Sequence, residues 1–457
     1  MKKCIAMLIP LLVLASLLSA HAMDNIGVKQ SSNNPAILKN EVLLNRDASN
    51  YTELRHIVLK GTNEQIGEAM GEIAKEDYNV SLYPYADPIY AKARLDYMQK
   101  NYPAFYERMK GVAAAYNVPL NSNLDLGRLA YDVEYPDCAM VYFPSSVTSN
   151  GHVMICRDID FYKAPYDILY DKTKNSSKPD ILQRAFVLET YPDEGYSSLI
   201  LGSMDLMGTI LHGFNSQGLG FDMQVDDFGT TNPNASLVGS RNNGISTFDI
   251  GRLILDNCKS IDEAKIALLN NKIYFFRTAL HFMIYDKYGH ATIAEFQGPI
   301  DPLKDGSIHF IDYSNNTTVM TNHAVYVVPG MMSVEEYLKK NQNATDCYYD
   351  TFVRYKTLSD IISNHKGKFT PQDMLDTLSS VYEEVTGGNM TGSTAGVAIK
   401  SRTLVNFLLD LTNGTLSARF YLKDGWTPEP GEDTGFYCPK ELHPIIFSKF
   451  FNFTLEK

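Results

Sequence analysis

One stretch of the sequence, residues 138–161, puts a thiol, a guanidinium and a carboxylate at the same end of an expected hairpin. Two strand-like runs flank the turn Ser149-Asn150-Gly151-His152, so Cys138 begins the first strand, and Arg157 and Asp160 end the strand that returns beside it. A thiolate is an effective nucleophile, a neighbouring cation lowers its pKa, and a carboxylate can orient a nearby amine. The pattern favours nucleophilic catalysis. The alternative is a structural cysteine, buried or disulfide-bonded, with Arg157 and Asp160 as ordinary strand-end charges.

The other cysteines bear on which thiol is reactive. Cys4 falls in an expected leader, so five of the six cysteines remain, and an odd number leaves one thiol unpaired or paired between chains. Strand alternation directs Cys156 away from the face that carries Arg157. No CxxC or HExxH motif occurs, so we expect neither a metal site nor a cofactor. Disulfide pairing stays open among Cys156, Cys258, Cys347 and Cys438.

Residues 1–22 have the three parts of a secretory signal peptide. Lys2 and Lys3 form a charged start, an apolar run continues to Leu18, and Ala20-His21-Ala22 is a small-residue cleavage site. The apolar run is shorter than the ~20 residues that span a bilayer, and no later segment is long and apolar enough. We therefore expect a soluble protein that is secreted, periplasmic or lysosomal. Sequons that a glycosylating host could modify begin at Asn50, Asn79, Asn175, Asn234, Asn315, Asn316, Asn343, Asn389, Asn413 and Asn452.

The composition excludes two classes of protein. With 44% hydrophobic and 21% charged residues in 457, the chain is an ordinary globular one rather than a disordered one. The formal net charge is −12 and no basic run occurs, so we expect no nucleic-acid partner. Residues 24–50 are polar, rich in asparagine and without periodicity, which predicts a mobile N-terminus of the mature chain.

The elements that must position the hairpin fall into two regions. Up to about residue 130 helix signals dominate, with a capping box over residues 62–65 and Pro103 at the start of a second helix. From Cys138 onward strand-like runs are joined by tight turns, including Asp286-Lys287-Tyr288-Gly289 and Thr412-Asn413-Gly414-Thr415, and helices intervene. This order predicts an α+β fold of two stacked, mainly antiparallel sheets flanked by helices.

Four segments together resemble the cysteine-type N-terminal nucleophile (Ntn) hydrolases. This group contains the bile salt hydrolases, penicillin V acylase, acid ceramidase, the N-acylethanolamine amidase and the isopenicillin-N acyltransferase. Its pattern of a cysteine, a hairpin and Arg-x-x-Asp with a following aromatic residue is similar to the run from Cys138 to Phe161. In the expected order follow residues 213–219 (Gly-Phe-Asn-Ser-Gln-Gly-Leu), Thr321-Asn322 and Arg354. The resemblance implies the αββα sandwich of that family.

The region before Cys138 also resembles one branch of the family. Residues 61–71 and 103–118 are similar to the pro-region of the acyltransferase-like and ceramidase-like members, whose precursor cleaves itself just before the cysteine. The resemblance implies autocleavage of the Asp137–Cys138 bond. Removal of residues 1–22 would then leave an α chain of residues 23–137, mainly helical, and a β chain of residues 138–457. The two chains would stay associated.

The resemblance also implies a role for each site residue. After cleavage Cys138 would be both nucleophile and base, since its freed α-amino group, with a reference pKa of about 8, can take the thiol proton. Arg157 would stabilise the thiolate, and Asp160 would hold the α-amino group in position. Asn322 would donate its side-chain amide to the oxyanion. Arg354 would complete the polar network around the nucleophile.

The sequence departs from the family pattern at one position of the expected oxyanion site. Gln224 stands where the family usually has asparagine. If that position contributes a backbone N–H, glutamine serves as well; if its side chain matters, geometry or substrate choice differs. Asn215 is better interpreted as a turn residue than as a catalytic one, because Asn and Gly supply the positive φ that turns need.

These observations predict an exported, self-cleaving amidase. It would hydrolyse a linear amide, a carbon–nitrogen bond other than a peptide bond, through a thioester on Cys138, and we favour a lipid N-acyl amide over a penicillin or a bile salt. One alternative is acyl transfer, in which an amine rather than water takes the acyl group. The other is a catalytically silent secreted binding protein on the same scaffold, although such a protein would not need Cys138, Arg157, Asp160 and Asn322 together.

Overall fold

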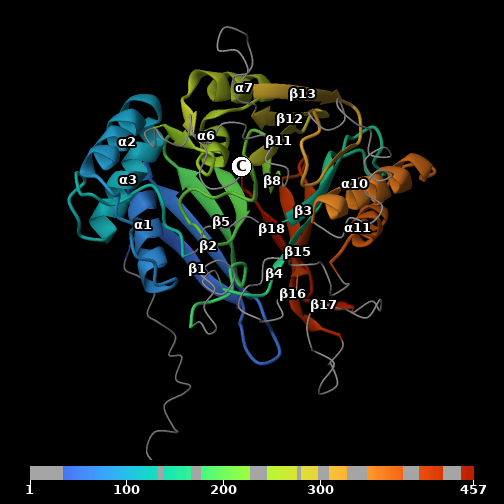
Figure 1. Cartoon of the computed structure of the whole chain (residues 1–457), viewed down its shortest axis with the longest axis horizontal. Helices are drawn as coiled ribbons and strands as arrows, with labels where there is room; N and C mark the ends of the chain where they lie inside the picture. The colour runs from blue at the N-terminus through green and yellow to red at the C-terminus, as the bar shows by residue number, and fades with distance from the viewer. Residues whose placement is uncertain are drawn as a thin grey trace, which may run out of the picture. The chain divides into compact units, whose positions relative to one another are not determined.

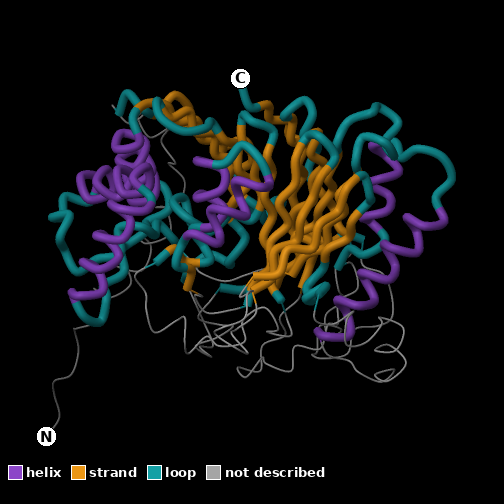
Figure 2. The backbone as a smooth tube through the Cα atoms, turned by 90° about the horizontal axis from the view of Figure 1, so that it is seen from above, coloured by secondary structure: helices purple, strands orange, loops and turns teal. Residues whose placement is uncertain are grey.

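The computed structural model describes residues 34–131, 137–165, 177–226, 244–274, 279–296, 308–326, 347–383, 401–425 and 444–456. Apart from Asn34, all of them belong to one compact unit, Pro35–Lys457. Within that unit two large β-sheets stack between helices (Figures 1 and 2). The predicted α+β class, with two mainly antiparallel sheets and flanking helices, is therefore confirmed.

Among the described residues, three helices precede the expected cleavage point: α1 (Asn63–Glu76), α2 (Pro88–Asn101) and α3 (Pro103–Ala115). The Thr62 hydroxyl accepts from the backbone N–H of Gln65, and the Thr62 N–H donates to the Gln65 side-chain oxygen, so the predicted capping box is confirmed. Helices α1 and α3 cross very closely. A Cβ atom at Gly67 would lie 2.1 Å from a carbonyl oxygen of α3, and one at Gly111 would lie 2.0 Å from a carbonyl oxygen of α1, so only glycine fits at these two positions.

The first sheet has nine strands in the order β1-β2-β5-β6-β7-β8-β11-β12-β13. Every neighbouring pair is antiparallel except β2 and β5, which run parallel. The strands are β1 (Ile37–Leu44), β2 (Glu53–Gly61), β5 (Arg184–Pro192), β6 (Ser198–Gly202), β7 (His212–Asn215), β8 (Leu219–Val225), β11 (Leu280–Asp286), β12 (His290–Phe296) and β13 (Ile308–Ser314).

The second sheet has seven strands in the order β14-β3-β4-β15-β16-β17, with β18 also paired to β16. Its neighbouring pairs are all antiparallel. The strands are β14 (Thr318–Met320), β3 (Asp137–Phe143), β4 (Met154–Tyr162), β15 (Ser401–Asp410), β16 (Thr415–Asp424), β17 (Ile445–Phe447) and β18 (Phe451–Thr454). A separate parallel pair joins β9 (Ile245–Ser246) to β10 (Ile273–Tyr274).

The predicted hairpins are confirmed, and each turn contains a glycine with positive φ. Gly151 lies between β3 and β4, Gly289 between β11 and β12, and Gly414 between β15 and β16, with φ of 72°, 101° and 69°. The prediction of a mobile segment over residues 24–50 is wrong for β1, which pairs with β2 at the sheet edge. A half-exposed edge strand buries few side chains, which explains why its sequence shows no apolar alternation.

Helices cover the outer faces of both sheets. On the first sheet α1 packs on β2 and β5, α6 (Ile250–Asn257) on β7 and β8, and α7 (Ile261–Asn270) on β11 and β12. On the second sheet α10 (Cys347–Asn364) packs on β14, and α11 (Pro371–Ser379) packs on β3 and β4. In Figure 1 these last two helices lie beside β3, opposite the side that faces β8. The inner faces of the two sheets thus enclose the start of β3, where Cys138 lies.

Candidate functional site

Cys138 and Arg157 lie on the same face of the β3–β4 pair. In this antiparallel register Cys138 is opposite Ile159 and Met140 is opposite Arg157, so all four side chains point toward the first sheet. Arg157 donates from Nη2 to the Sγ of Cys138 at 2.9 Å, and both side chains are fully buried. The expected hairpin therefore brings the thiol and the guanidinium into direct contact.

The Arg157 guanidinium also links the two sheets. Its Nη1 donates to Oδ1 of Asp222 at 2.7 Å and to the carbonyl oxygen of Leu211. Its Nη2 donates to the carbonyl oxygen of Met223 at 2.7 Å. Because β4 belongs to the second sheet, whereas Asp222 and Met223 lie in β8 of the first and Leu211 directly precedes β7, the thiol lies at a fixed point between the sheets.

Asp222 is the fully buried counter-ion of this guanidinium. His212 lies 3.0 Å from it through Nδ1, and the Tyr285 hydroxyl donates to it at 2.6 Å. Burial acts to raise the pKa of Asp222, but His212, Arg157 and Tyr285 outweigh it, so the pKa lies below its ordinary value. Asp222 is therefore a permanent anion that holds Arg157 in place.

The Cys138 thiol is neutral in the uncut chain. Burial raises its pKa to about 12, although the charge of Arg157 and its hydrogen bond act in the opposite direction. The contact with Arg157 prepares the sulfur to carry a negative charge but does not remove its proton. Chemistry at Cys138 thus needs a base that can take this proton.

Asn322 and Arg354 hold the backbone of the nucleophile. The N–H of Cys138 donates to Oδ1 of Asn322 at 2.9 Å, and the same oxygen accepts from Nη2 of Arg354 at 3.0 Å. Nη1 of Arg354 donates to the carbonyl oxygen of Cys138 at 2.6 Å. Nδ2 of Asn322 donates to the carbonyl oxygen of Val225 at 3.0 Å, which leaves its second hydrogen for a developing oxyanion. Residues from β3, β8, α10 and the segment after β14 therefore meet at Cys138.

Asp160 lies on the other face of β4, opposite Asp137 in the register. It accepts from the hydroxyl of Thr403, while Asp158, on the same face, accepts from the N–H of Ala139. In both carboxyl groups the second oxygen is buried without a hydrogen-bond partner among the described residues. Burial raises the pKa of Asp158 to about 7, and burial together with the Asp158 charge raises that of Asp160 well above its ordinary value. Two carboxyl groups thus flank the Asp137–Cys138 bond from behind, whereas the Cys138 nitrogen itself is bonded to Asn322.

Gln224 follows Asp222 by two residues, so its side chain points from β8 toward the second sheet. Its backbone lies opposite His281 of β11. The N–H of Asp226, again two residues on, donates to Ala279, on the β11 side of β8. By the same alternation the N–H of Gln224 points at β11 and away from Cys138. Of the two ways in which Gln224 could matter, the backbone donor is therefore excluded and the side chain remains.

Comparison with known proteins identifies the family. Residues 168–421 match the family model of acyl-coenzyme A:6-aminopenicillanic acid acyl-transferase, which is more than half of the chain. The chain belongs to this acyltransferase family. The resemblance to Ntn hydrolases inferred from the motifs is thereby confirmed. The matched range contains Gln224, Asn322 and Arg354 and begins after Cys138 and Arg157.

Solved structures of two enzymes are similar to the chain. Two crystal structures of single-residue variants of conjugated bile acid hydrolase from Clostridium perfringens are 17% and 16% identical, each with a TM-score of 0.41. The alignments cover 62% and 70% of this chain and 89% and 99% of those chains. Penicillin V acylase from Agrobacterium tumefaciens is 14% identical over 62% of this chain and 82% of its own, with a TM-score of 0.35. A search of curated proteins gave no match.

Several contacts of the site were not predicted from the sequence of this family member. Asp222 stands two residues before Gln224, so strand alternation could have indicated that the two share a face. The Asp158 carboxyl lies inside the Arg157–Asp160 motif itself. The carbonyl oxygens that position Arg157 and Asn322 carry no sequence signal, because every residue has one. These acceptors belong to Leu211, Met223 and Val225.

The expectation of disulfides is not supported for the cysteines that the structure describes. Cys156 and Cys258 are buried thiols, and burial raises the pKa of both above its ordinary value. The side chains of Cys347 and Cys438 lie outside the described residues, as do the whole predicted leader and the sequons at Asn175, Asn234, Asn343 and Asn389. Cys156 does point away from Arg157, toward α11, as strand alternation predicted.

Among the described residues, no group of three or more His, Cys, Asp or Glu side chains could hold a metal ion. In the same part of the chain, no helix is long and apolar enough to cross a membrane.

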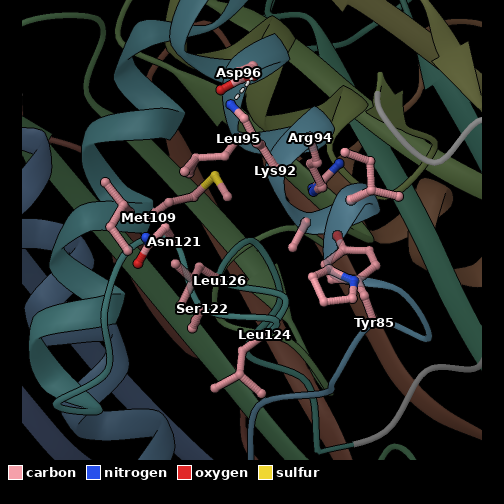
Figure 3. A pocket seen from close by; sticks show the side chains of 14 residues that line it. Tyr85, Lys92, Arg94, Leu95, Asp96, Met109, Asn121, Ser122, Leu124 and Leu126 are labelled. Carbon is pink, nitrogen blue, oxygen red and sulfur yellow. Dashed lines mark hydrogen bonds and ion pairs between the residues drawn. The ribbon is translucent and has the colours of Figure 1, made fainter.

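A cavity elsewhere in the molecule is separate from this chemistry. It has a volume of about 440 Å³ and lies between α2, α3 and residues 120–126 (Figure 3). Leu95, Met109 and Leu126 contribute to its apolar wall, and Lys92 forms an ion pair of 2.7 Å with Asp96 beside it. None of the residues around Cys138 lines this cavity.

Proposed function

We propose that the protein is exported by residues 1–22, cleaves itself between Asp137 and Cys138, and then hydrolyses a linear N-acyl amide through a thioester on Cys138. The observation that carries the proposal is the double contact of one residue. The Cys138 sulfur is 2.9 Å from a guanidinium nitrogen, and the Cys138 nitrogen is 2.9 Å from a side-chain amide oxygen. One contact suits a thiolate and the other suits an α-amine.

Self-cleavage would proceed in two balanced steps. The Cys138 thiol adds to the carbonyl carbon of Asp137, the C–N bond breaks, and the proton passes to the Cys138 nitrogen, which leaves a thioester. Water then hydrolyses the thioester to an Asp137 carboxylic acid and the thiol. The buried carboxyl groups of Asp158 and Asp160, whose pKa values are raised, are suited to supply protons beside this bond.

Cleavage would create the base that the uncut chain lacks. The freed α-amine, with a reference pKa of about 8, would remain bonded to Asn322 next to the sulfur. It would take the thiol proton as the sulfur attacks the substrate carbonyl, and then give it to the departing amine. The second Nδ2 hydrogen of Asn322 would stabilise the oxyanion, and Arg157 the developing thiolate. Water would then take the acyl group and release a carboxylic acid.

Association of the two chains after cleavage is supported by the contacts across the cut. Strand β2 pairs with β5 over nine residues, from Glu53–Arg184 to Gly61–Pro192. Two buried ion pairs also join the segments: Arg94 with Asp249 at 3.0 Å and Arg108 with Asp256 at 2.7 Å. Removal of residues 23–137 would expose a strand edge and take the arginine partner from two buried carboxylates, so dissociation is strongly disfavoured.

Acyl transfer is the second candidate, and the description of the matching family model favours it. In that reaction a second amine, rather than water, would attack the thioester and form a new amide. The same residues would serve both reactions, because the attacking group loses a proton to the same α-amine. The ratio of carboxylic acid to new amide formed in the presence of a competing amine distinguishes hydrolysis from acyl transfer.

Intact-mass measurement and N-terminal sequencing of the purified protein and of a Cys138→Ala variant test the proposal. We expect two chains, the larger beginning Cys-Ala-Met, and a single uncut chain in the variant. The cleaved protein should release carboxylic acid from N-acyl amides. An uncut wild-type chain at every pH from acidic to neutral would contradict the mechanism and leave the silent binding protein in its place.

A further inference from the structure

Beside the proposed oxyanion site, four buried polar side chains form one cluster, which we call the polar cluster: Gln224, His281, Glu295 and His323. Gln224 pairs with His281 across β8 and β11, and His281 pairs with Glu295 across β11 and β12. Opposite partners share a face, so these three form a row that points toward the second sheet. His323 follows Asn322, and none of the four is more than 1% exposed. The cluster is therefore built from three neighbouring strands and the segment that carries Asn322.

Most polar atoms of the polar cluster have no hydrogen-bond partner within the described part of the chain. These atoms are Oε1 and Nε2 of Gln224, Nδ1 and Nε2 of His281, and Nε2 of His323. His281 approaches Oε1 of Glu295 only to 3.7 Å, too far for a hydrogen bond. A buried polar group without a hydrogen bond is destabilising, so such groups are rarely gathered without a role. Asp222, on the same face two residues away, has hydrogen bonds to both of its oxygens and so differs from the polar cluster.

The polar cluster borders the point where the amine of the substrate must lie. Gln224 stands between Met223 and Val225, whose carbonyl oxygens hold Arg157 and Asn322. In the proposed reaction the departing amine takes its proton from the Cys138 nitrogen, and that nitrogen is bonded to Asn322. The amine half of the substrate would therefore lie next to Asn322, which His323 follows in the chain and whose amide is bonded to Val225, the residue after Gln224.

The charges of the polar cluster restrict what it can bind. Burial, with further contributions from His281 and Arg354, lowers the pKa of His323 to about 3, so this ring is neutral. Glu295 is engaged by the backbone N–H groups of Val325 and Tyr326, at 2.5 and 2.9 Å. The Glu295 carboxylate would repel an anionic ligand, and Arg354 would repel a cationic one. A neutral group that both donates and accepts hydrogen bonds matches an amide and imidazole rings.

We propose that the polar cluster binds the amine half of the substrate and selects amines that carry a neutral donor–acceptor group, a hydroxyl or a primary carboxamide. This inference rests on the proposed amidase function and deepens it. The inference does not concern the acyl half of the substrate, because the polar cluster adjoins Asn322 and the departing amine.

The test uses amides of one fatty acid that differ only in the amine: N-(2-hydroxyethyl), N-(carbamoylmethyl), N-propyl and N-carboxymethyl. Purified, self-cleaved enzyme is assayed for kcat/KM on each. We expect the hydroxyethyl and carbamoylmethyl amides to exceed the propyl amide by at least about tenfold, because a site with buried polar groups rejects an analogue that leaves them unpaired. The carboxymethyl amide should be the poorest substrate.

Two independent variants, His281→Leu and Gln224→Met, should each reduce the hydroxyethyl-to-propyl ratio toward one, while Gln224→Asn should keep part of the preference. Thr292→Val is the matched control. Thr292 is a buried, unpartnered hydroxyl on β12, but it lies on the opposite face from Glu295, so its loss should leave both rates unchanged. Self-cleavage and the thermal midpoint of each variant report whether it folds.

The outcomes separate the inference from the function on which it rests. A wild-type ratio near one, a preference for the carboxymethyl amide, or variants that slow the hydroxyethyl and propyl amides equally would overturn the selection of neutral polar amines while leaving the amidase intact. Self-cleaved enzyme that hydrolyses none of the four amides would overturn both.

Discussion

The two faces of the β3–β4 pair each bury a cysteine, and only one of them is equipped for chemistry. Cys138 points toward the first sheet together with Arg157. Cys156 points the other way, toward α11, where its sulfur approaches the carbonyl oxygen of Met374 at 3.6 Å. Both are fully buried, and burial raises the pKa of both thiols.

The difference between the faces is the charge that each offers to the sulfur. On the Cys138 side a guanidinium, held by Asp222, opposes the effect of burial. The Asp158 carboxyl group raises the pKa of both thiols, so the guanidinium is what sets the Cys138 side apart. Burial alone therefore makes a cysteine inert, and the fixed cation rather than the thiol distinguishes a nucleophile from a core residue.

Replacing Arg157 by methionine should remove the cation beside Cys138 and cause the largest loss of activity among these variants. We expect kcat/KM of the cleaved enzyme to fall at least about 10³-fold, since a preorganised donor to a developing charge is lost. Accumulation of uncut precursor should accompany the fall. Quantifying uncut chain and amide hydrolysis in parallel measures both.

Arg402→Met is the matched control for this prediction. Arg402 is also a buried arginine with a carboxylate partner, Asp424 at 2.7 Å, but it contacts none of the residues around Cys138. Its loss should lower the thermal midpoint through an uncompensated carboxylate and leave kcat/KM of the folded fraction unchanged. Equal losses of kcat/KM in the two variants would contradict the prediction, because they would show that the contact between Arg157 and Cys138 has no special role.

The next largest effect is expected at Asn322. Asn322→Ala removes both the acceptor of the Cys138 nitrogen and the proposed oxyanion donor, so kcat should fall by about 10²–10³-fold with little change in KM. Asn215→Ala is the comparison. The oxygen of Asn215 accepts from the N–H groups of Gln217 and Leu219, and its amide nitrogen donates to two carbonyls. That variant should lose stability but not kcat, and a matching loss of kcat would contradict the turn assignment.

These contacts also show which parts of the site a sequence can reveal. The Cys138–Arg157 contact depends on a short hairpin whose turn carries an Asn-Gly signal, so alternation along two adjacent strands is enough to predict it. The same alternation placed Cys156 on the far face. Asn322 and Arg354 reach Cys138 from 184 and 216 residues away, and only the family resemblance suggested them.

Features that depend on packing between the sheets were out of reach of the sequence. The role of Asp222 requires that β8 of one sheet lie over β4 of the other, and no local pattern encodes that stacking. The direction of the Gln224 N–H depends on which neighbour pairs with each edge of β8. Edge strand β1 was missed because a strand with one paired side and few buried residues has a polar, aperiodic sequence.

The carboxyl groups on the far face should make stability depend on pH. The folded-state pKa of Asp158 is raised to about 7, above its ordinary value of 3.8, chiefly by burial. Stabilisation from such a group is complete at low pH and is lost as the pH rises through the folded pKa, because the folded state binds the extra proton. Between about pH 4 and 7 we expect the unfolding free energy to fall with pH, by up to about 1.4 kcal/mol per unit, and to level off above that range.

Asp158→Asn, which mimics the protonated acid, should flatten this pH dependence in denaturant titrations. Asp373→Asn serves as the control. Asp373 caps α11 at the surface, and its pKa is lowered by bonds from Thr370, so it titrates below the window. An unchanged slope in the Asp158 variant would show that the carboxyl is ionised throughout and that Arg354 outweighs its burial.

The smallest effect is expected at Cys156, the counterpart of the nucleophile. Cys156→Ala removes one buried sulfur from a cluster that includes Phe369, Met374 and Leu378, so the unfolding free energy should fall by only about 1 kcal/mol. Self-cleavage and kcat/KM should remain within about twofold, since a sulfur on the far face contacts neither Arg157 nor the substrate. Denaturant unfolding and the amide assay measure the two quantities. A tenfold loss of kcat/KM in a stable variant would mean that the far face contributes to the reaction, and the cation beside Cys138 would then no longer suffice to separate the two thiols.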